Sequence, residues 1–291
     1  MPSVRVILWS IVVLLILAAG VLYLVIRPIA ETPTDVAWFS DTADVEPLPT
    51  PGPLDWLANY EEAGQNFAEY VASDPPVPTD DRRMIYLLPI GDDIGPLNQI
   101  ADGLADFTGL PVAVLEPWLP APSEIESREN AGQTQWLTHD ILAELKRRLP
   151  DDAFCILGLT VTDLWTGPGS NFVFGQASLR NRVGVQSFAR YGEPGSPDFR
   201  KRSFKVIAHE TAHMFGIRHC IAHHCLMNGS NSRPEMDAKP MTLCPVCLHK
   251  LHHAVGFDVV RRYEDVADHL RGIGDEESAG WIERRVSRLQ P

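Results

Sequence analysis

The chain has 291 residues, of which 45% are hydrophobic, enough for one good-sized folded domain plus an extension. Its formal net charge is −13, with 38 acidic against 25 basic side chains. This balance argues against a nucleic-acid-binding protein, which would need a basic surface to bind phosphate.

The first 27 residues are predicted to form a transmembrane anchor. Residues 6–26 are a nearly unbroken apolar run, about long enough to cross a hydrocarbon core of roughly 30 Å as a helix. A cleavable signal peptide is the alternative, because residues 17–20 are Leu-Ala-Ala-Gly. The apolar run continues past that point, however, and is longer than the core of a typical signal peptide, which favours the uncleaved anchor.

The flanking charges favour a single-pass protein with its domain on the extracytoplasmic side. Arg5 and Arg27 flank the apolar run, the α-amino group adds charge at the N-terminal side, and no further Lys or Arg occurs until Arg82. The closely spaced cysteines described below favour the opposite, reducing side, although a bound metal would protect them.

Residues 28–80 are predicted to be a proline-rich linker with one short helix. Four prolines within residues 47–53 favour an extended, stiff backbone, and a second proline-rich piece covers residues 75–78. Between them, residues 54–71 have a helical pattern with several aromatic residues that could pack.

Residues 81–272 are predicted to form one α/β domain, followed by a charged tail at residues 273–291. The hydrophobic patterns predict strands at 84–90, 112–115, 154–160, 171–177 and 182–187, and helices at 96–107, 133–148 and within 244–270. Because strands and helices alternate in the first half, the sheet is expected to be mostly parallel.

One short segment of this domain holds ligands for a metal ion with an open coordination position. His209 and His213 are four residues apart, so on a helix they share one face and can hold a single zinc ion. Glu210 is expected to be the general base that takes a proton from a zinc-bound water. Gly216 can end the helix, so that the chain returns His219 as the third ligand. Ordinary helix and loop histidines are the alternative interpretation.

Two other features lie close to this segment. Met227 is followed by an Asn-Gly turn signal and resembles the methionine that metzincins place beneath their zinc ligands, although it could simply fill the core. His223 and His224 could also provide the third ligand, but the spacing favours His219.

Four of the five cysteines suit a second, closed metal site that would hold zinc for a structural purpose. They are Cys220, Cys225, Cys244 and Cys247. Because Cys220 directly follows His219, this site would fix the loop that carries the third histidine. Two disulfides and a redox-active C-x-x-C are the alternatives. The fifth cysteine, Cys155, lies in an apolar run and is expected to be buried and inert.

Together these residues resemble the archaemetzincins, a family of zinc metallopeptidases. The shared pattern is H-E-x-x-H-x-x-G-x-x-H directly followed by Cys, then C-x-M, and later C-x-x-C. The segments at 171–177 and 183–190 also look like the family, so the resemblance covers roughly residues 84–260. The gap between Met227 and Cys244 is one residue shorter than is usual in the family, which a loop can absorb.

The resemblance implies a single metzincin-like domain with an active-site helix, one catalytic and one structural zinc ion, and hydrolysis of a peptide or protein substrate. In metzincins the substrate pairs with an exposed edge strand, which one of the strands at 171–177 and 182–187 could provide; an ordinary hairpin is equally compatible. No Tyr follows Met227, where some metzincins carry one, so the residue that stabilises the oxyanion is not identified.

We therefore predict a membrane-anchored zinc metallopeptidase, either an aminopeptidase or an endopeptidase. A catalytically weak peptide-binding protein and a zinc- or redox-responsive membrane sensor are the alternatives. The presence of Glu210 argues against a pure binding domain, because binding does not require a general base.

Overall fold

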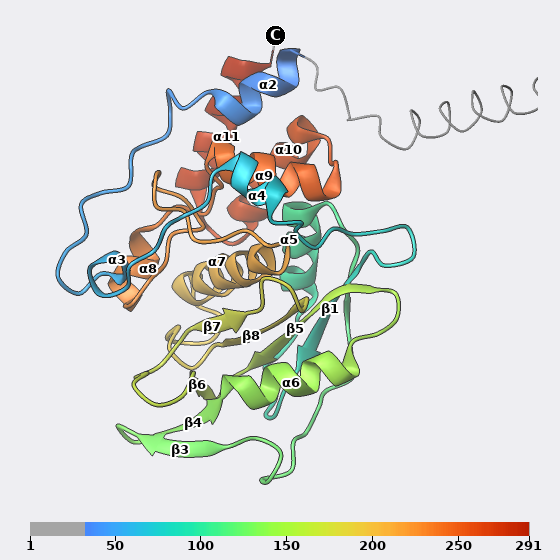
Figure 1. The fold of residues 1–291 in the computed structure, drawn as a ribbon, viewed down its shortest axis with the longest axis vertical. Coiled ribbons are helices and arrows are strands. Elements are labelled where there is room, and N and C mark those ends of the chain that lie inside the picture. The colour runs from blue at the N-terminus through green and yellow to red at the C-terminus, as the bar shows by residue number, and fades with distance from the viewer. Residues whose placement is uncertain (1–32, 291) are drawn as a thin grey trace, which may run out of the picture. The chain divides into compact units, whose positions relative to one another are not determined.

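A five-stranded sheet with the order β2-β1-β5-β8-β7 lies at the centre of the computed structural model (Figure 1). Its strands are β1 (Met84–Pro89), β2 (Val112–Val114), β5 (Ala153–Thr160), β7 (Gly175–Ala177) and β8 (Val183–Ser187). The pairs β1–β2, β1–β5 and β5–β8 are parallel, whereas β7 runs antiparallel to β8 at the edge. Every residue of β5 is buried, as expected for a central strand with both faces covered. The predicted mostly parallel α/β sheet is confirmed.

The structure describes residues 33–290, so the predicted anchor at residues 6–26 lies outside the described residues. Within the described range, no helix has both the length and the apolar character needed to cross a membrane.

Helices cover both faces of the sheet (Figure 1). On one face, α5 (Asn98–Thr108) and α7 (Pro197–Met214) pack over a core that includes alternate residues of β1 such as Ile85 and Leu87. On the other face, α6 (Thr138–Arg148) packs over Leu88 and its neighbours. Side chains of successive residues in a strand point to opposite faces, so one strand contributes to both layers.

Residues 127–137 differ from the prediction, because a second sheet replaces the start of the expected helix at 133–148. This sheet has the order β3 (Ser127–Asn130), β4 (Gln133–Leu137) and β6 (Asp163–Trp165). The side chain of Gln135 is buried and donates a hydrogen bond of 2.6 Å to Asp163. Pairing with a strand that is distant in sequence outweighs the local helical pattern, and α6 begins at Thr138.

Two other predicted helices are each interrupted. The segment 54–71 contains α3 (Trp56–Asn59) and α4 (Phe67–Ala72), and between them Gly64 has a φ of +67°. The segment 244–270 contains α9 (Pro245–Val255) and α10 (Val259–Gly272). Gly256, with a φ of +75°, takes the left-handed conformation that ends α9.

The segments expected to be a linker and a tail contribute to the core. Trp38 is 2% exposed, Tyr70 is fully buried, and both belong to the larger hydrophobic cluster. The tail forms α11 (Glu276–Leu289), which buries Ala279 and Ile282 and packs against α10. α8 (Arg233–Ala238) lies near the metal-binding segment, and α2 (Pro33–Ser40) begins the described chain.

Arg285 joins the N-terminal segment to α11. Its guanidinium is fully buried, pairs with Asp44, and donates to the backbone carbonyls of Trp38 at 3.1 Å and Asp41 at 3.0 Å. A buried charge with this many partners is costly to remove, because its buried and partly buried acceptors lose a hydrogen-bond donor.

We predict that Arg285→Met lowers the free energy of unfolding by about 3 kcal/mol, since the carbonyls of Trp38 and Asp41 lose a donor and Asp44 loses its buried partner. The matched control is Arg288→Met, because Arg288 pairs with Asp41 and Asp44 from a more exposed position. It is expected to cost less than about 1 kcal/mol. Urea unfolding measures both; equal losses in the two variants would contradict the role given to Arg285.

Candidate active site

The helix α7 carries the first two histidines, and its sequence explains where it starts and stops. The Ser196 side chain accepts a hydrogen bond from the Phe199 amide at 3.2 Å, and Pro197 occupies the first turn, as is common at helix starts. Residues 203–212 are all buried. Gly216, with a φ of +80°, then turns the chain away from the helix axis.

The structure brings together His209, His213 and His219, the three predicted histidine ligands. One ring nitrogen from each lies within 4.8 Å of the others, and the Nε2 atoms of His209 and His213 are 3.0 Å apart. The alternative ligands His223 and His224 are not part of this cluster.

The Nδ1 atom of each imidazole is already occupied by a hydrogen bond. The acceptors are the carbonyl of Leu226 for His209 at 2.9 Å, the carbonyl of Ile217 for His213 at 2.6 Å, and the carboxylate of Glu62 for His219 at 2.7 Å. Because a carbonyl or carboxylate oxygen accepts, each Nδ1 carries the proton and each Nε2 presents a lone pair.

This arrangement fits a bound cation. Two Nε2 lone pairs at 3.0 Å repel each other unless a positive charge lies near both. Zinc–nitrogen bonds of about 2.0–2.1 Å in a tetrahedron place neighbouring nitrogens about 3.3 Å apart, close to the observed separation. Burial holds the pKa of His209 well below its usual value and lowers that of His213 to about 3, so both rings are in the neutral form that binds metal.

Glu210 lies beside the histidines in a buried position, 6% exposed. Burial raises the pKa of its carboxyl group to about 8, partly opposed by the charge of Lys239. Edge strand β7 passes directly over this side chain. A methyl group on Gly175 would lie 2.8 Å from the Glu210 Oε1 atom, so the absence of a side chain at Gly175 provides the space for the carboxyl group.

These residues open into a cleft of about 740 Å³. Its polar floor consists of the three histidines and Glu210, and Gln176 and Ala177 of β7 form part of one wall. The large apolar side chains that line it include Trp56, Tyr60, Phe172, Phe174, Val206 and Met236. A cleft with an exposed edge strand beside a polar centre can accommodate an extended peptide.

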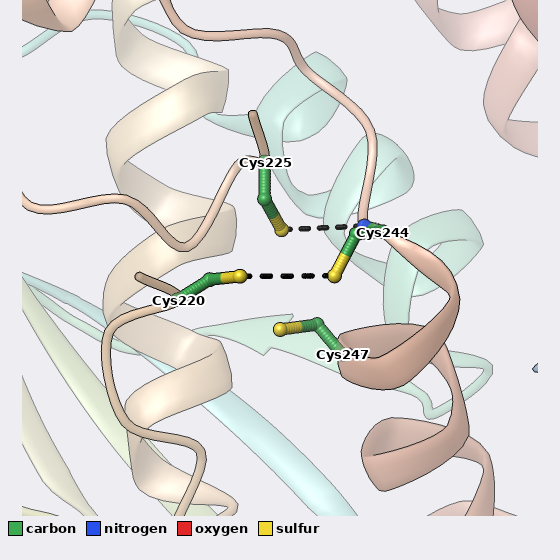
Figure 2. A group of neighbouring side chains, drawn as sticks. All are labelled: Cys220, Cys225, Cys244 and Cys247. Atoms are coloured by element: carbon green, nitrogen blue, oxygen red, sulfur yellow. Dashed lines mark hydrogen bonds between the residues drawn. The ribbon is translucent and has the colours of Figure 1, made fainter. Parts of the chain in front are cut away.

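The four cysteines form a second cluster, and Figure 2 shows their sulfur atoms directed toward a common centre. The sulfurs of Cys220 and Cys244 are 3.8 Å apart, and all four cysteines are buried and free of disulfides. Zinc–sulfur bonds of about 2.3 Å in a tetrahedron give sulfur–sulfur separations of about 3.8 Å. The donor set therefore fits zinc. Cys155 is buried elsewhere, in β5.

Residues 225–228 connect the two clusters. The carbonyl of Leu226 accepts from His209, and the carbonyl of Met227 accepts from the Cys220 amide at 2.8 Å. The Asn228 side chain donates to the Cys220 carbonyl at 2.6 Å. Met227 is fully buried in this turn. The same short segment thus positions one predicted histidine ligand and the start of the cysteine cluster.

Three residues of this site were not found from the sequence. Glu62 and Trp56 belong to the predicted linker and reach the site through tertiary packing. Lys239 is buried, lines the cleft and donates to the Asn228 carbonyl at 2.9 Å. No motif includes these positions; the aromatic residues at 56 and 60 were the one available signal that this segment packs.

The sequence model of Peptidase family M54 matches residues 126–253, which include all seven predicted metal ligands. Human archaemetzincin-2 is 38% identical to this chain over 276 residues, covering 80% of this chain and 75% of the relative.

The chain belongs to the archaemetzincin family.

Human archaemetzincin-1 is 33% identical over 253 residues, covering 72% of this chain and 51% of that protein. A crystal structure of the archaemetzincin from Methanopyrus kandleri is 31% identical with a TM-score of 0.52, covering 61% of this chain and 98% of that chain. The predicted family is confirmed, and this archaemetzincin is a zinc metallopeptidase with a mixed α/β domain.

We predict that Gly175→Ala reduces kcat at least about tenfold while metal content stays unchanged, because the new methyl group displaces the Glu210 carboxyl group. The control is Gly272→Ala, at an exposed helix end where the nearest atom would be 3.9 Å away. Peptide cleavage and zinc content are measured for both. A Gly175→Ala enzyme with normal kcat would show that Glu210 is not held by β7.

Proposed function

We propose that His209, His213 and His219 hold the catalytic zinc ion of this peptidase and that Glu210 is its general base. The observation that supports this most directly is the convergence of three Nε2 lone pairs beside a buried carboxyl group. When bound, the zinc ion supplies a Lewis acid for the scissile carbonyl and lowers the pKa of the attacking water.

The chain's own residues would then carry out proton transfer and substrate alignment. The positive charges of Lys239 and of a bound zinc ion would favour the ionised form of Glu210. Its carboxylate oxygen would take the proton of the attacking water and pass it to the nitrogen of the departing amine. Burial keeps this proton away from bulk solvent during the transfer. We also propose that the substrate lies extended along β7, which is an edge strand of the sheet among the described strands and whose residues Gln176 and Ala177 line the cleft.

The second zinc ion is proposed to be structural and bound by Cys220, Cys225, Cys244 and Cys247. Four buried thiols leave no open coordination position, so this site would stabilise the fold rather than bind substrate. The same burial disfavours a redox sensor, because a sensor cysteine needs access to its oxidant. A pure peptide-binding domain is disfavoured by the general base in the cleft.

We predict that Glu210→Gln lowers kcat by about 10³-fold, because the isosteric amide cannot accept the proton. It should retain two zinc ions per chain, the number we also expect for the wild type. Cleavage of a peptide library and metal analysis test both statements. The control is Glu61→Gln, at an exposed position with no assigned role. If Glu210→Gln still cleaves peptides at the wild-type rate, Glu210 is not the general base. If the wild type binds only one zinc ion per chain, the proposed second zinc site is wrong.

We further propose that residues 6–26 anchor the protein in a membrane with the peptidase domain on the extracytoplasmic side. The support is the length of the apolar run and the absence of Lys or Arg between Arg27 and Arg82.

We predict that the full chain stays in the membrane fraction after alkaline extraction. Leu15→Arg should weaken this retention, because a charge at the centre of a span costs roughly 3 kcal/mol. Leu15→Ile is the matched control. Protease added to intact cells should cleave the domain. Release of the wild type from the membrane by alkali would contradict the anchor. Full protection of the domain from protease would contradict the proposed orientation.

A further inference from the structure

Glu62 is in direct contact with a histidine of the catalytic site although it lies far from the metal-binding motif in sequence. Its Oε1 atom accepts hydrogen bonds from His219 Nδ1 at 2.7 Å and from Trp56 Nε1 at 3.0 Å. Glu62 also lies outside the residues that the Peptidase family M54 model matches.

His219 differs from the other two histidines in its secondary structure and in its hydrogen-bond partner. His209 and His213 are fixed by α7, and their Nδ1 protons go to nearby backbone carbonyls. His219 lies on a loop after Gly216, outside any helix or strand. Its Nδ1 partner is a charged side chain from a segment 157 residues away in the chain. A loop histidine without such a partner could rotate its ring away from the other two.

Several contacts hold Glu62 in place. The Trp56 amide donates to Glu235 at 2.8 Å, and the indole packs edge-on against His219 with ring centroids 5.3 Å apart. Gly229 gives the indole room, since a methyl group there would lie 2.4 Å from a Trp56 ring carbon. On the other side, the Gln65 side chain donates to the Gly216 carbonyl at 3.3 Å. The segment is therefore fixed against the loop that carries His219.

The charge on Glu62 also fits a positive partner at His219. Its second oxygen, Oε2, is buried and has no hydrogen-bond partner among the described residues. A half-buried carboxylate with one unpaired oxygen is costly unless positive charge lies nearby. An imidazole bound to a cation would supply the compensating charge.

We propose that Glu62 is a positioning residue of the catalytic zinc site: it holds the Nδ1 proton of His219 and directs Nε2 toward His209 and His213. This inference rests on the proposed role of the three histidines. It means that the segment around residues 56–65, outside the metal-binding motif, completes the metal site of this chain. A carboxylate at this position also makes the imidazole a stronger donor to the metal.

The test compares Glu62→Ala, Glu62→Gln and the adjacent exposed control Glu61→Gln in the full chain. Zinc affinity is measured by competition with a chromogenic chelator. Glu62→Ala is expected to weaken one of the two zinc sites about 10–100-fold and leave the other unchanged. Glu62→Gln should weaken it less, because the amide oxygen can still accept from Nδ1. Glu61→Gln should behave as the wild type.

Cobalt substitution provides a readout that a general loss of stability would not produce. With Co²⁺ at the histidine site, the visible absorption should shift in Glu62→Ala and Glu62→Gln and remain unchanged in Glu61→Gln. A variant that keeps the metal at its cysteine site is folded. If Glu62→Ala does not fold, the nearly isosteric Glu62→Gln tests whether Glu62 positions His219.

The possible failures are distinguishable. If the wild type binds two zinc ions and both Glu62 variants match its affinity and cobalt spectrum, this inference is wrong and the proposed function stands. If a variant with all three histidines replaced binds as much zinc as the wild type, the proposed catalytic site itself is wrong. If Glu61→Gln weakens zinc binding as much as Glu62→Gln does, the inference is also wrong, because the loss of one negative charge would then explain both effects.

Discussion

The proposed zinc site depends on one constraint: three imidazoles must present unprotonated Nε2 atoms to a single point. An acceptor for the Nδ1 proton fixes both the tautomer and the orientation of an imidazole. The structure provides one acceptor for each ring, the carbonyls of Leu226 and Ile217 and the carboxylate of Glu62. Two acceptors follow α7 and the third comes from a distant segment, so the arrangement of these loops is part of the proposed metal site.

The cysteine cluster explains how these loops are held without regular secondary structure. Between α7 and α9 the chain has one short helix, α8, and backbone hydrogen bonds alone would leave much of it mobile. Four converging thiols fix both ends of this region, and the turn at Met227 connects them to His209 through Leu226. Stability and ligand geometry therefore depend on the same residues.

The N-terminal segment has a role that its composition did not indicate. Proline-rich stretches favour extended backbone, and here the extended chain runs across the molecule instead of away from it. Trp38 and Arg285 join it to the C-terminal helix, while Trp56 and Glu62 bring it against the catalytic cleft. An apparent linker can thus be part of the fold when its aromatic and charged side chains find buried partners.

The sequence by itself determined the family and the candidate metal ligands. The spacing of His209, Glu210, His213 and His219, and the pairs of cysteines, specify ligand types because helix geometry and coordination chemistry impose short, regular separations. It also determined the buried strands of the parallel sheet. Tertiary structure decided the rest: the strand at 133–137, the space that Gly175 leaves for Glu210, and the contact of Glu62 with His219. These depend on residues far apart in the chain, and no local pattern encodes such pairings.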